Sequence, residues 1–192
     1  MADEFILETH GLTKEFAGFF AVRDVDLKVR RGSIHALIGP NGAGKTTCFN
    51  LLTKFLSPSA GRILYKGQDI TAMAPADVAR LGLVRSFQIS AVFPHLTALE
   101  IATTLALDPE MMLLDEPMAG MGHEDIDKIA ALIKRISAKY TILMVEHNLS
   151  VVANLSDIIT VLTRGEVLAE GNYADLTKNE KVKEAYLGAG HG

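Results

Sequence analysis

Three shortages in this 192-residue sequence exclude whole classes of protein. The single cysteine, Cys48, excludes an internal disulfide and fits a reducing compartment. Acidic residues outnumber basic ones by 23 to 19, and the net charge of −4 argues against a protein that binds nucleic acid by neutralising phosphates. The longest run without a charged residue, Ser86 to Leu99, is too short to cross a bilayer and contains Pro94. Any role at a membrane is therefore expected to be peripheral.

Targeting signals and repeats are also missing. The N-terminal segment is acidic and has no basic region of the kind that begins a secretory signal. Apolar residues make up 48% and charged residues 22%, which is the balance of an ordinary globular protein. We therefore expect residues 1–192 to form a single folded domain.

Short apolar runs alternate with helical patterns through most of the chain. The runs at 34–38, 111–114 and 141–145 are typical of strands buried on both faces, as in a parallel sheet. Between the last two runs, isoleucines recur on one face of residues 124–138, which predicts an amphipathic helix. This alternation predicts an α/β fold with a parallel sheet.

Two segments depart from that pattern and indicate antiparallel structure. Residues 24–30 alternate between apolar and polar with period two, which predicts a half-exposed antiparallel strand near the N-terminus. Residues 158–162 and 166–170 flank a turn of Thr, Arg and Gly, which predicts a hairpin followed by two short helices.

The strongest motif matches G-x-x-x-x-G-K-[ST] and lies between the strand at 34–38 and a helix expected at about 45–54. Small residues let backbone N–H groups turn toward phosphate oxygens, and the positive end of the following helix faces them. Lys45 is expected to reach the β- and γ-phosphates, and the Thr46 hydroxyl to ligate Mg²⁺. The alternative, a glycine-rich turn without a ligand, is disfavoured because both flanking elements are present. The motif comprises Gly39, Pro40, Asn41, Gly42, Ala43, Gly44, Lys45 and Thr46.

Two carboxylates end the apolar run at 111–114. Asp115 and Glu116 are expected at the C-terminal end of a buried strand, the edge where open α/β sheets bind ligands. Asp115 would hold Mg²⁺, directly or through water, and Glu116 would orient the attacking water or take its proton. The alternative is a solvated strand end stopped by Pro117. The neighbouring phosphate loop favours the catalytic role, because Mg-nucleotide chemistry needs such a carboxylate.

Two further polar residues follow apolar runs. His147 comes just after 141–145 and could contact the γ-phosphate, although a histidine in this place can also be a capping or core residue. Gln88 follows Leu83 and Val84 and could face Mg²⁺ or the attacking water, but by itself it does not identify a site. The other five histidines show no metal-ligand spacing.

In this order the motifs resemble those of an ABC-type ATPase, the nucleotide-binding subunit of a transporter. The match comprises a Walker A motif at 39–46, the Q-loop at Gln88, a Walker B motif at 111–115 with Glu116, and the switch histidine His147. The resemblance implies a P-loop NTPase (RecA-like) core with a parallel sheet and an N-terminal antiparallel β subdomain. It also implies ATP and Mg²⁺ as cofactors.

The resemblance adds three residues to the expected ATP site. Phe16 occupies the place of an aromatic residue that stacks on adenine in this family, although ordinary packing would also explain an aromatic there. Val22 and Thr47 are further ATP contacts that the family implies. Residues 117–121 lie where the family has its D-loop, a segment at the dimer interface.

Four shorter stretches are similar to the branched-chain amino acid importer subfamily, whose close relatives serve urea uptake and lipopolysaccharide export: 34–39, 86–88, 115–120 and 184–188. This similarity implies ATP hydrolysis coupled to import at the cytoplasmic face of the plasma (inner) membrane, with the chain bound peripherally. The implied partners are integral membrane permease subunits and a second ATP-binding subunit, in a homo- or heterodimer. A solute-binding protein would be an indirect partner.

One segment of that family is missing. Its members have a helical subdomain between Q-loop and Walker B, ending in a Leu-Ser-Gly-Gly-Gln-like signature. Here Gln88 and Asp115 are only 27 positions apart, and no such signature occurs. We therefore expect the helical subdomain to be absent, with the join near 97–100. Either the deletion is real, or a segment was omitted from a continuously numbered sequence.

The missing segment keeps other functions open. In the family each phosphate lies between the P-loop of one subunit and the signature of the other. The alternative to a transport ATPase is therefore a signature-less ATP-binding module with little or no hydrolysis. A third hypothesis is a small P-loop kinase. It is disfavoured because Asp115 and Glu116 together with His147 indicate water as the nucleophile.

Overall fold

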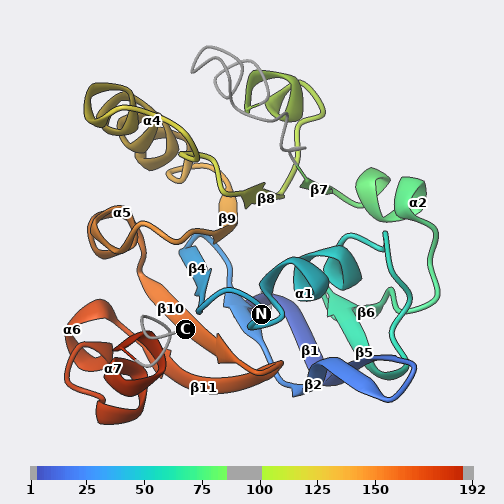
Figure 1. Ribbon diagram of the computed structural model, residues 1–192. Coiled ribbons are helices and arrows are strands. Elements are labelled where there is room, and N and C mark those ends of the chain that lie inside the picture. The colour runs from blue at the N-terminus through green and yellow to red at the C-terminus, as the bar shows by residue number, and fades with distance from the viewer. Residues whose placement is uncertain (1–3, 86–100, 188–192) are drawn as a thin grey trace.

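A computed structural model of the chain describes residues 4–85 and 101–187. Gln88 and the join expected near 97–100 lie outside these ranges. The described residues form two sheets with helices on both sides of the larger one (Figure 1).

The larger sheet is mostly parallel, as the apolar runs predict. Its six strands lie in the order β11-β10-β4-β9-β8-β7, and all pair in parallel except β11, which runs antiparallel to β10. Every residue of β4, β8 and β9 is buried, as expected for strands covered on both faces. The predicted strands and the hairpin are confirmed. The bounds are β4 (Ile34–Ile38), β7 (Leu83–Arg85), β8 (Met111–Asp115), β9 (Thr141–Val145), β10 (Ile158–Thr163) and β11 (Glu166–Gly171).

The smaller sheet is antiparallel and comes from the N-terminal part of the chain. Four strands follow the order β2-β1-β5-β6, and β3 pairs with β1. The strand predicted at 24–30 has the expected alternating burial, but it is divided between β2 and β3. The bounds are β1 (Phe5–Phe16), β2 (Phe19–Val25), β3 (Lys28–Arg30), β5 (Ala60–Tyr65) and β6 (Gln68–Asp69).

The division between β2 and β3 has a local cause on β1. The buried Thr9 hydroxyl donates to the Val25 carbonyl at 2.8 Å and accepts from the Leu27 amide at 2.9 Å. The side chain thereby takes over hydrogen bonds that a continuous strand would make through its backbone. A period-two pattern on one strand cannot reveal this, because the interrupting hydroxyl belongs to another strand.

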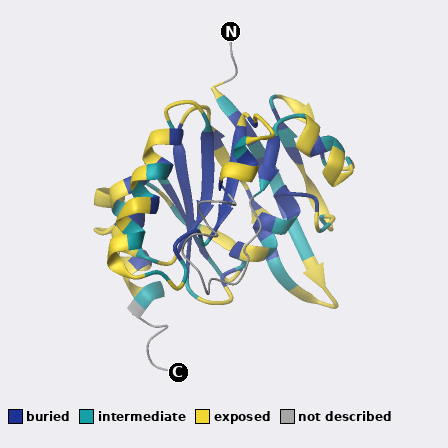
Figure 2. Cartoon of the chain, turned by 90° about the horizontal axis from the view of Figure 1, so that it is seen from above, coloured by how far each residue is buried: buried dark blue, intermediate teal, exposed yellow. Residues whose placement is uncertain are grey.

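Helices complete the two cores. α1 (Lys45–Leu52) packs between the antiparallel sheet and one face of the parallel sheet. The other face is covered by α4 (His123–Ile136), α5 (Leu149–Leu155), α6 (Tyr173–Leu176) and α7 (Glu180–Leu187). Viewed from above, the buried strands lie between these exposed helices and the antiparallel sheet (Figure 2).

The described part of the connection between β6 and β8 contains little helix. α2 (Pro75–Arg80) precedes β7, and within the described part of that connection beyond β7 only residues 101–105 are helical. None of the helices in the described ranges has the length and apolar character needed to span a membrane.

His35 is a buried histidine whose protonation opposes folding. It lies within β4 with no exposed surface, and its Nε2 is 2.8 Å from the Thr160 hydroxyl oxygen. That hydroxyl donates to Glu170 at 2.6 Å, so it accepts from His35 and Nε2 carries a proton. Burial lowers the pKa of His35 to about 4.

This shift predicts a loss of stability in mild acid. The unfolded chain takes up a proton on His35 near pH 6.5, whereas the folded chain does so only near pH 4. The free energy of unfolding should therefore fall by up to about 3 kcal/mol as the pH drops through this window. Urea unfolding of wild type and His35→Gln at pH 7, 6, 5 and 4 measures the effect. The variant should lose less stability than wild type, and equal losses would contradict the prediction.

Candidate active site

The loop between β4 and α1 is held in shape by close contacts at two glycines. A Cβ at Gly39 would lie 2.3 Å from the Leu162 carbonyl oxygen, and a Cβ at Gly44 would lie 2.3 Å from that of Ala21. Gly44 also has φ of +98°, in the left-handed region that favours glycine. Only residues without a side chain fit at these two places, so the loop is pressed against its neighbours at the N-terminus of α1.

Lys45 crosses this loop. Its Nζ donates to the carbonyl oxygens of Gly39 at 2.7 Å and Pro40 at 3.0 Å. Burial lowers the pKa of Lys45, and the negative charge of Glu116 opposes that shift. The P-loop lysine and the predicted catalytic carboxylate, 71 positions apart in the sequence, therefore act on each other in the folded protein.

Asp115 ends β8 in an ion pair with an arginine. Arg85, the last residue of β7, places one guanidinium nitrogen 2.6 Å from Asp115 Oδ2. Another nitrogen donates to the Asn50 side-chain oxygen on α1, also at 2.6 Å. Arg85 thus links the predicted metal ligand to the helix that begins at the P-loop.

Sequence reasoning did not identify Arg85. The signal was present, because Arg85 follows the run of Leu83 and Val84 and the carboxyl ends of neighbouring parallel strands meet at one edge. An arginine at the end of one strand and a carboxylate at the end of another are then natural partners.

Glu116 and His147, two residues of the predicted site, lie close together in the folded chain. The Glu116 amide donates to the Val145 carbonyl at 2.9 Å, and its backbone has φ of +45°. This turn leaves Glu116 Oε2 at 3.9 Å from His147 Nδ1. The two side chains therefore lie side by side beyond the ends of β8 and β9.

The remaining predicted ATP contacts differ in their exposure. Phe16 ends β1 at the tip of the β1–β2 hairpin, is 46% exposed, and has the Lys14 ammonium 5.1 Å from its ring centre. Val22 has no exposed surface and packs in the core with Ala43, which suits support of the loop rather than direct contact with a nucleotide. Asn41, Gly42 and Thr46 are exposed, and Thr47 is half-buried.

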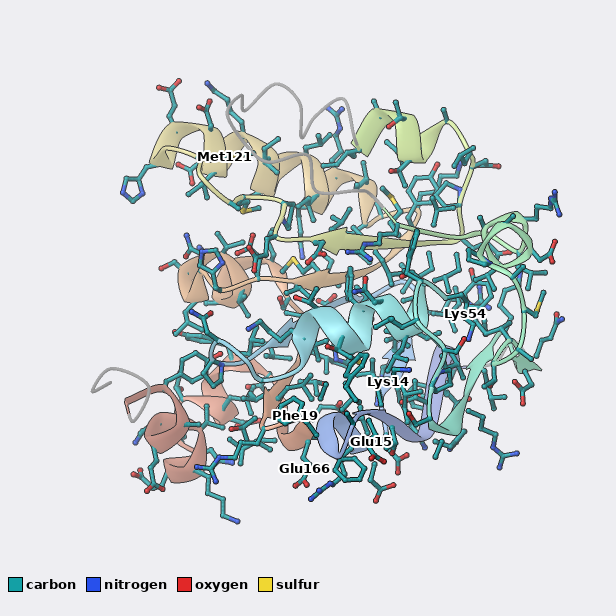
Figure 3. All side chains as sticks on the ribbon, turned by 45° about the vertical axis from the view of Figure 1, so that its right-hand side comes forward. Lys14, Glu15, Phe19, Lys54, Met121 and Glu166 are labelled. Carbon is teal, nitrogen blue, oxygen red and sulfur yellow. The ribbon has the colours of Figure 1, made fainter. Side chains whose placement is uncertain are left out.

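The hairpin tip and the segment before α4 mark opposite sides of the molecule. Figure 3 shows Glu15 and Phe19, next to Phe16 at the hairpin tip, far from Met121. The hairpin tip and Met121 therefore lie on different parts of the molecule.

Comparison with known proteins identifies the family. Residues 22–100 match the family described as ABC transporter, and residues 166–192 match the branched-chain amino acid ATP-binding cassette transporter family. The chain is 31% identical to the high-affinity branched-chain amino acid transport ATP-binding protein BraF of Pseudomonas aeruginosa, over 95% of this chain and 98% of BraF. The chain belongs to the ATP-binding cassette family of ABC transporters. The family resemblance stated from the motifs is therefore confirmed.

Other relatives of this ATP-binding cassette support the same family and fold. The probable branched-chain amino acid transport ATP-binding protein LivG of Archaeoglobus fulgidus is 30% identical, over 96% of each chain. The crystal structure of a nucleotide-free ATP-binding cassette superposes with a TM-score of 0.90 at 25% identity, covering 95% of this chain and 98% of the other. An ATP-binding cassette in its ADP conformation gives the same TM-score and identity, covering 96% and 99%. The predicted fold class is confirmed.

The lengths of these matches differ from the length of the chain. The match with BraF extends over 249 residues, whereas this chain has 192. Part of the matched length of BraF therefore has no counterpart here.

Proposed function

We propose that this chain is the ATP-binding and ATP-hydrolysing subunit of an ABC importer for branched-chain amino acids. One observation supports the proposal most directly. Lys45, Asp115 and Glu116 lie where the C-terminal end of β8 and the N-terminus of α1 come together. Phosphoryl transfer to water needs a cationic cradle, a metal ligand and a group that orients the water. The names of BraF and LivG support the substrate class.

The residues divide the reaction between them. Backbone N–H groups of the loop 39–44 and the N-terminus of α1 bind the phosphates. Lys45 exchanges the carbonyls of Gly39 and Pro40 for phosphate oxygens. Glu116 takes a proton from a water whose oxygen bonds to the γ-phosphorus as the bond to the ADP oxygen breaks. His147 contacts the γ-phosphate beside Glu116.

Adenine binding and the metal complete the proposed site. Phe16 stacks on adenine. Among the residues that the structure describes, no group of three His, Cys, Asp or Glu side chains is arranged to hold a metal alone. This suits Mg²⁺ in a nucleotide site, where one or two carboxylates act with phosphate oxygens and water. Thr46 and Asp115, with Gln88, would hold Mg²⁺, which neutralises charge on the phosphates.

We place the subunit at the cytoplasmic face of the inner membrane, where it contacts permease subunits and pairs with a second ATP-binding subunit. A solute-binding protein acts on it only through the permease.

We also propose that the helical segment of the family is missing near 97–100. The excess length of the BraF match supports this. In the family each P-loop site uses the signature of the partner subunit, so a second copy of this chain would not supply one and the chain alone should hydrolyse ATP slowly.

The binding step is tested by Lys45→Ala. Each charge-assisted hydrogen bond to phosphate contributes about 1.5–3 kcal/mol, so the affinity for ATP should fall by roughly 10- to 100-fold. Titration with a fluorescent ATP analogue measures the affinity without requiring turnover. Lys134→Ala, which changes an exposed lysine on α4, is the matched control and should bind like wild type. Unchanged affinity in a folded Lys45→Ala variant would contradict the proposed site.

A further inference from the structure

Glu146 is a carboxylate enclosed by the protein directly after β9. It is 1% exposed, and burial raises its pKa. Among the described residues no lysine or arginine forms an ion pair with it. Its hydrogen-bond partners are three backbone amides, and they come from two different loops.

Each carboxylate oxygen serves one loop. Oε1 accepts from the Met118 amide at 3.1 Å, in the segment that follows Glu116. Oε2 accepts from the amides of His147 at 3.1 Å and Asn148 at 3.2 Å. Glu146 is therefore a bridge between the turn after β8 and the turn after β9.

Burial of this carboxylate destabilises the fold unless these hydrogen bonds are made. Moving a carboxylate out of water costs several kcal/mol, and hydrogen bonds from N–H groups offset that cost. The three amides satisfy the carboxylate only while both loops stay in place. The bridge thus fixes the two loops relative to each other.

The two loops that Glu146 joins carry Glu116 and His147, the side chains that the proposed mechanism places beside the attacking water and the γ-phosphate. Glu116 lies two residues before Met118, and His147 directly follows Glu146. We propose that Glu146 is a positioning residue for ATP hydrolysis, which sets His147 beside Glu116 at the observed 3.9 Å. This inference rests on the proposed ATPase function. Glu146 acts through the backbone of both loops and does not itself contact the substrate.

The experiment is the substitution Glu146→Gln. Glutamine has nearly the same shape but only one acceptor oxygen, and its NH₂ group would face an amide donor. One of the two loops then loses its acceptor. Because misplacement of a reacting group by about 1 Å can cost 10²-fold in rate, kcat should fall by roughly 10- to 100-fold. The KM for ATP should change much less than kcat, because Lys45 and the phosphate loop, which make most of the phosphate contacts, are untouched.

A control variant and a second measurement separate positioning from folding. Glu124→Gln changes an exposed glutamate on α4 and should leave kcat unchanged. Amide hydrogen exchange then reports the bridge directly. In Glu146→Gln the amides of Met118 or His147 should exchange faster, while those of β8 and β9 keep their protection.

The outcomes distinguish this inference from the proposed function. Unchanged kcat, or unchanged exchange at both Met118 and His147, would overturn the positioning role. A parallel loss of kcat, ATP affinity and strand protection would also overturn it, because Glu146 would then only support the fold. If wild type binds ATP but never hydrolyses it, the proposed function fails and the positioning role fails with it. Faster exchange at these amides would then still show the bridge as a purely structural link.

Discussion

Replacing Glu116 with glutamine is expected to lower the rate of ATP hydrolysis by about 10²- to 10⁴-fold, the usual contribution of a general base. Glutamine keeps the shape of the side chain but cannot take a proton from water. Affinity for ATP should be equal or tighter, because a negative charge near Lys45 and the phosphates is removed. Loss of turnover with retained binding would assign Glu116 to the chemical step.

The measurement has to resolve slow rates, since the chain is expected to work slowly without a partner subunit. Release of labelled phosphate from ATP, followed for hours with protein in excess, is sensitive enough. Glu166→Gln provides the control, because Glu166 is an exposed glutamate at the start of β11. A Glu116→Gln rate within about three-fold of wild type would mean that another group activates the water.

The central strands and the P-loop could be predicted because their signals are local. β4 and β9 have the bounds that the apolar runs indicate, and α1 begins at Lys45 as the motif requires. A strand buried on both faces is apolar along its whole length, whatever pairs with it. The glycines of the loop likewise follow from the chemistry of phosphate binding.

Features that depend on distant partners could not be predicted. β1 runs for 12 residues from Phe5 to Phe16, yet its sequence mixes polar and apolar residues, because different parts of it pair with β2, β3 and β5. The role of Thr9 becomes visible only when β2 lies beside β1. Glu146 looks like a solvated residue next to a histidine until the Met118 amide is placed against it. In the last two cases a side chain from one segment satisfies the backbone of another.

Arg85→Ala is expected to reduce the free energy of unfolding by about 3–5 kcal/mol, the typical cost of removing one partner from a buried ion pair. The side chains of Arg85 and Asp115 are only 13% and 7% exposed. Without the guanidinium, Asp115 keeps a buried charge and Asn50 loses the donor at 2.6 Å. The contact between the guanidinium and the Phe49 ring, 5.5 Å from its centre, is lost as well.

The chain contains a matched pair for comparison. Arg80 and Asp77 also meet at 2.6 Å, but their side chains are 77% and 49% exposed, so Arg80→Ala should cost less than about 1 kcal/mol. Urea unfolding of both variants measures the difference, and equal losses would show that burial of the Arg85 pair contributes nothing. Arg85→Ala combined with Asp115→Asn should regain part of the lost stability, because the unpaired charge is then gone. If the double variant regains none, the loss comes from the Asn50 and Phe49 contacts, and Asp115 tolerates burial without its arginine.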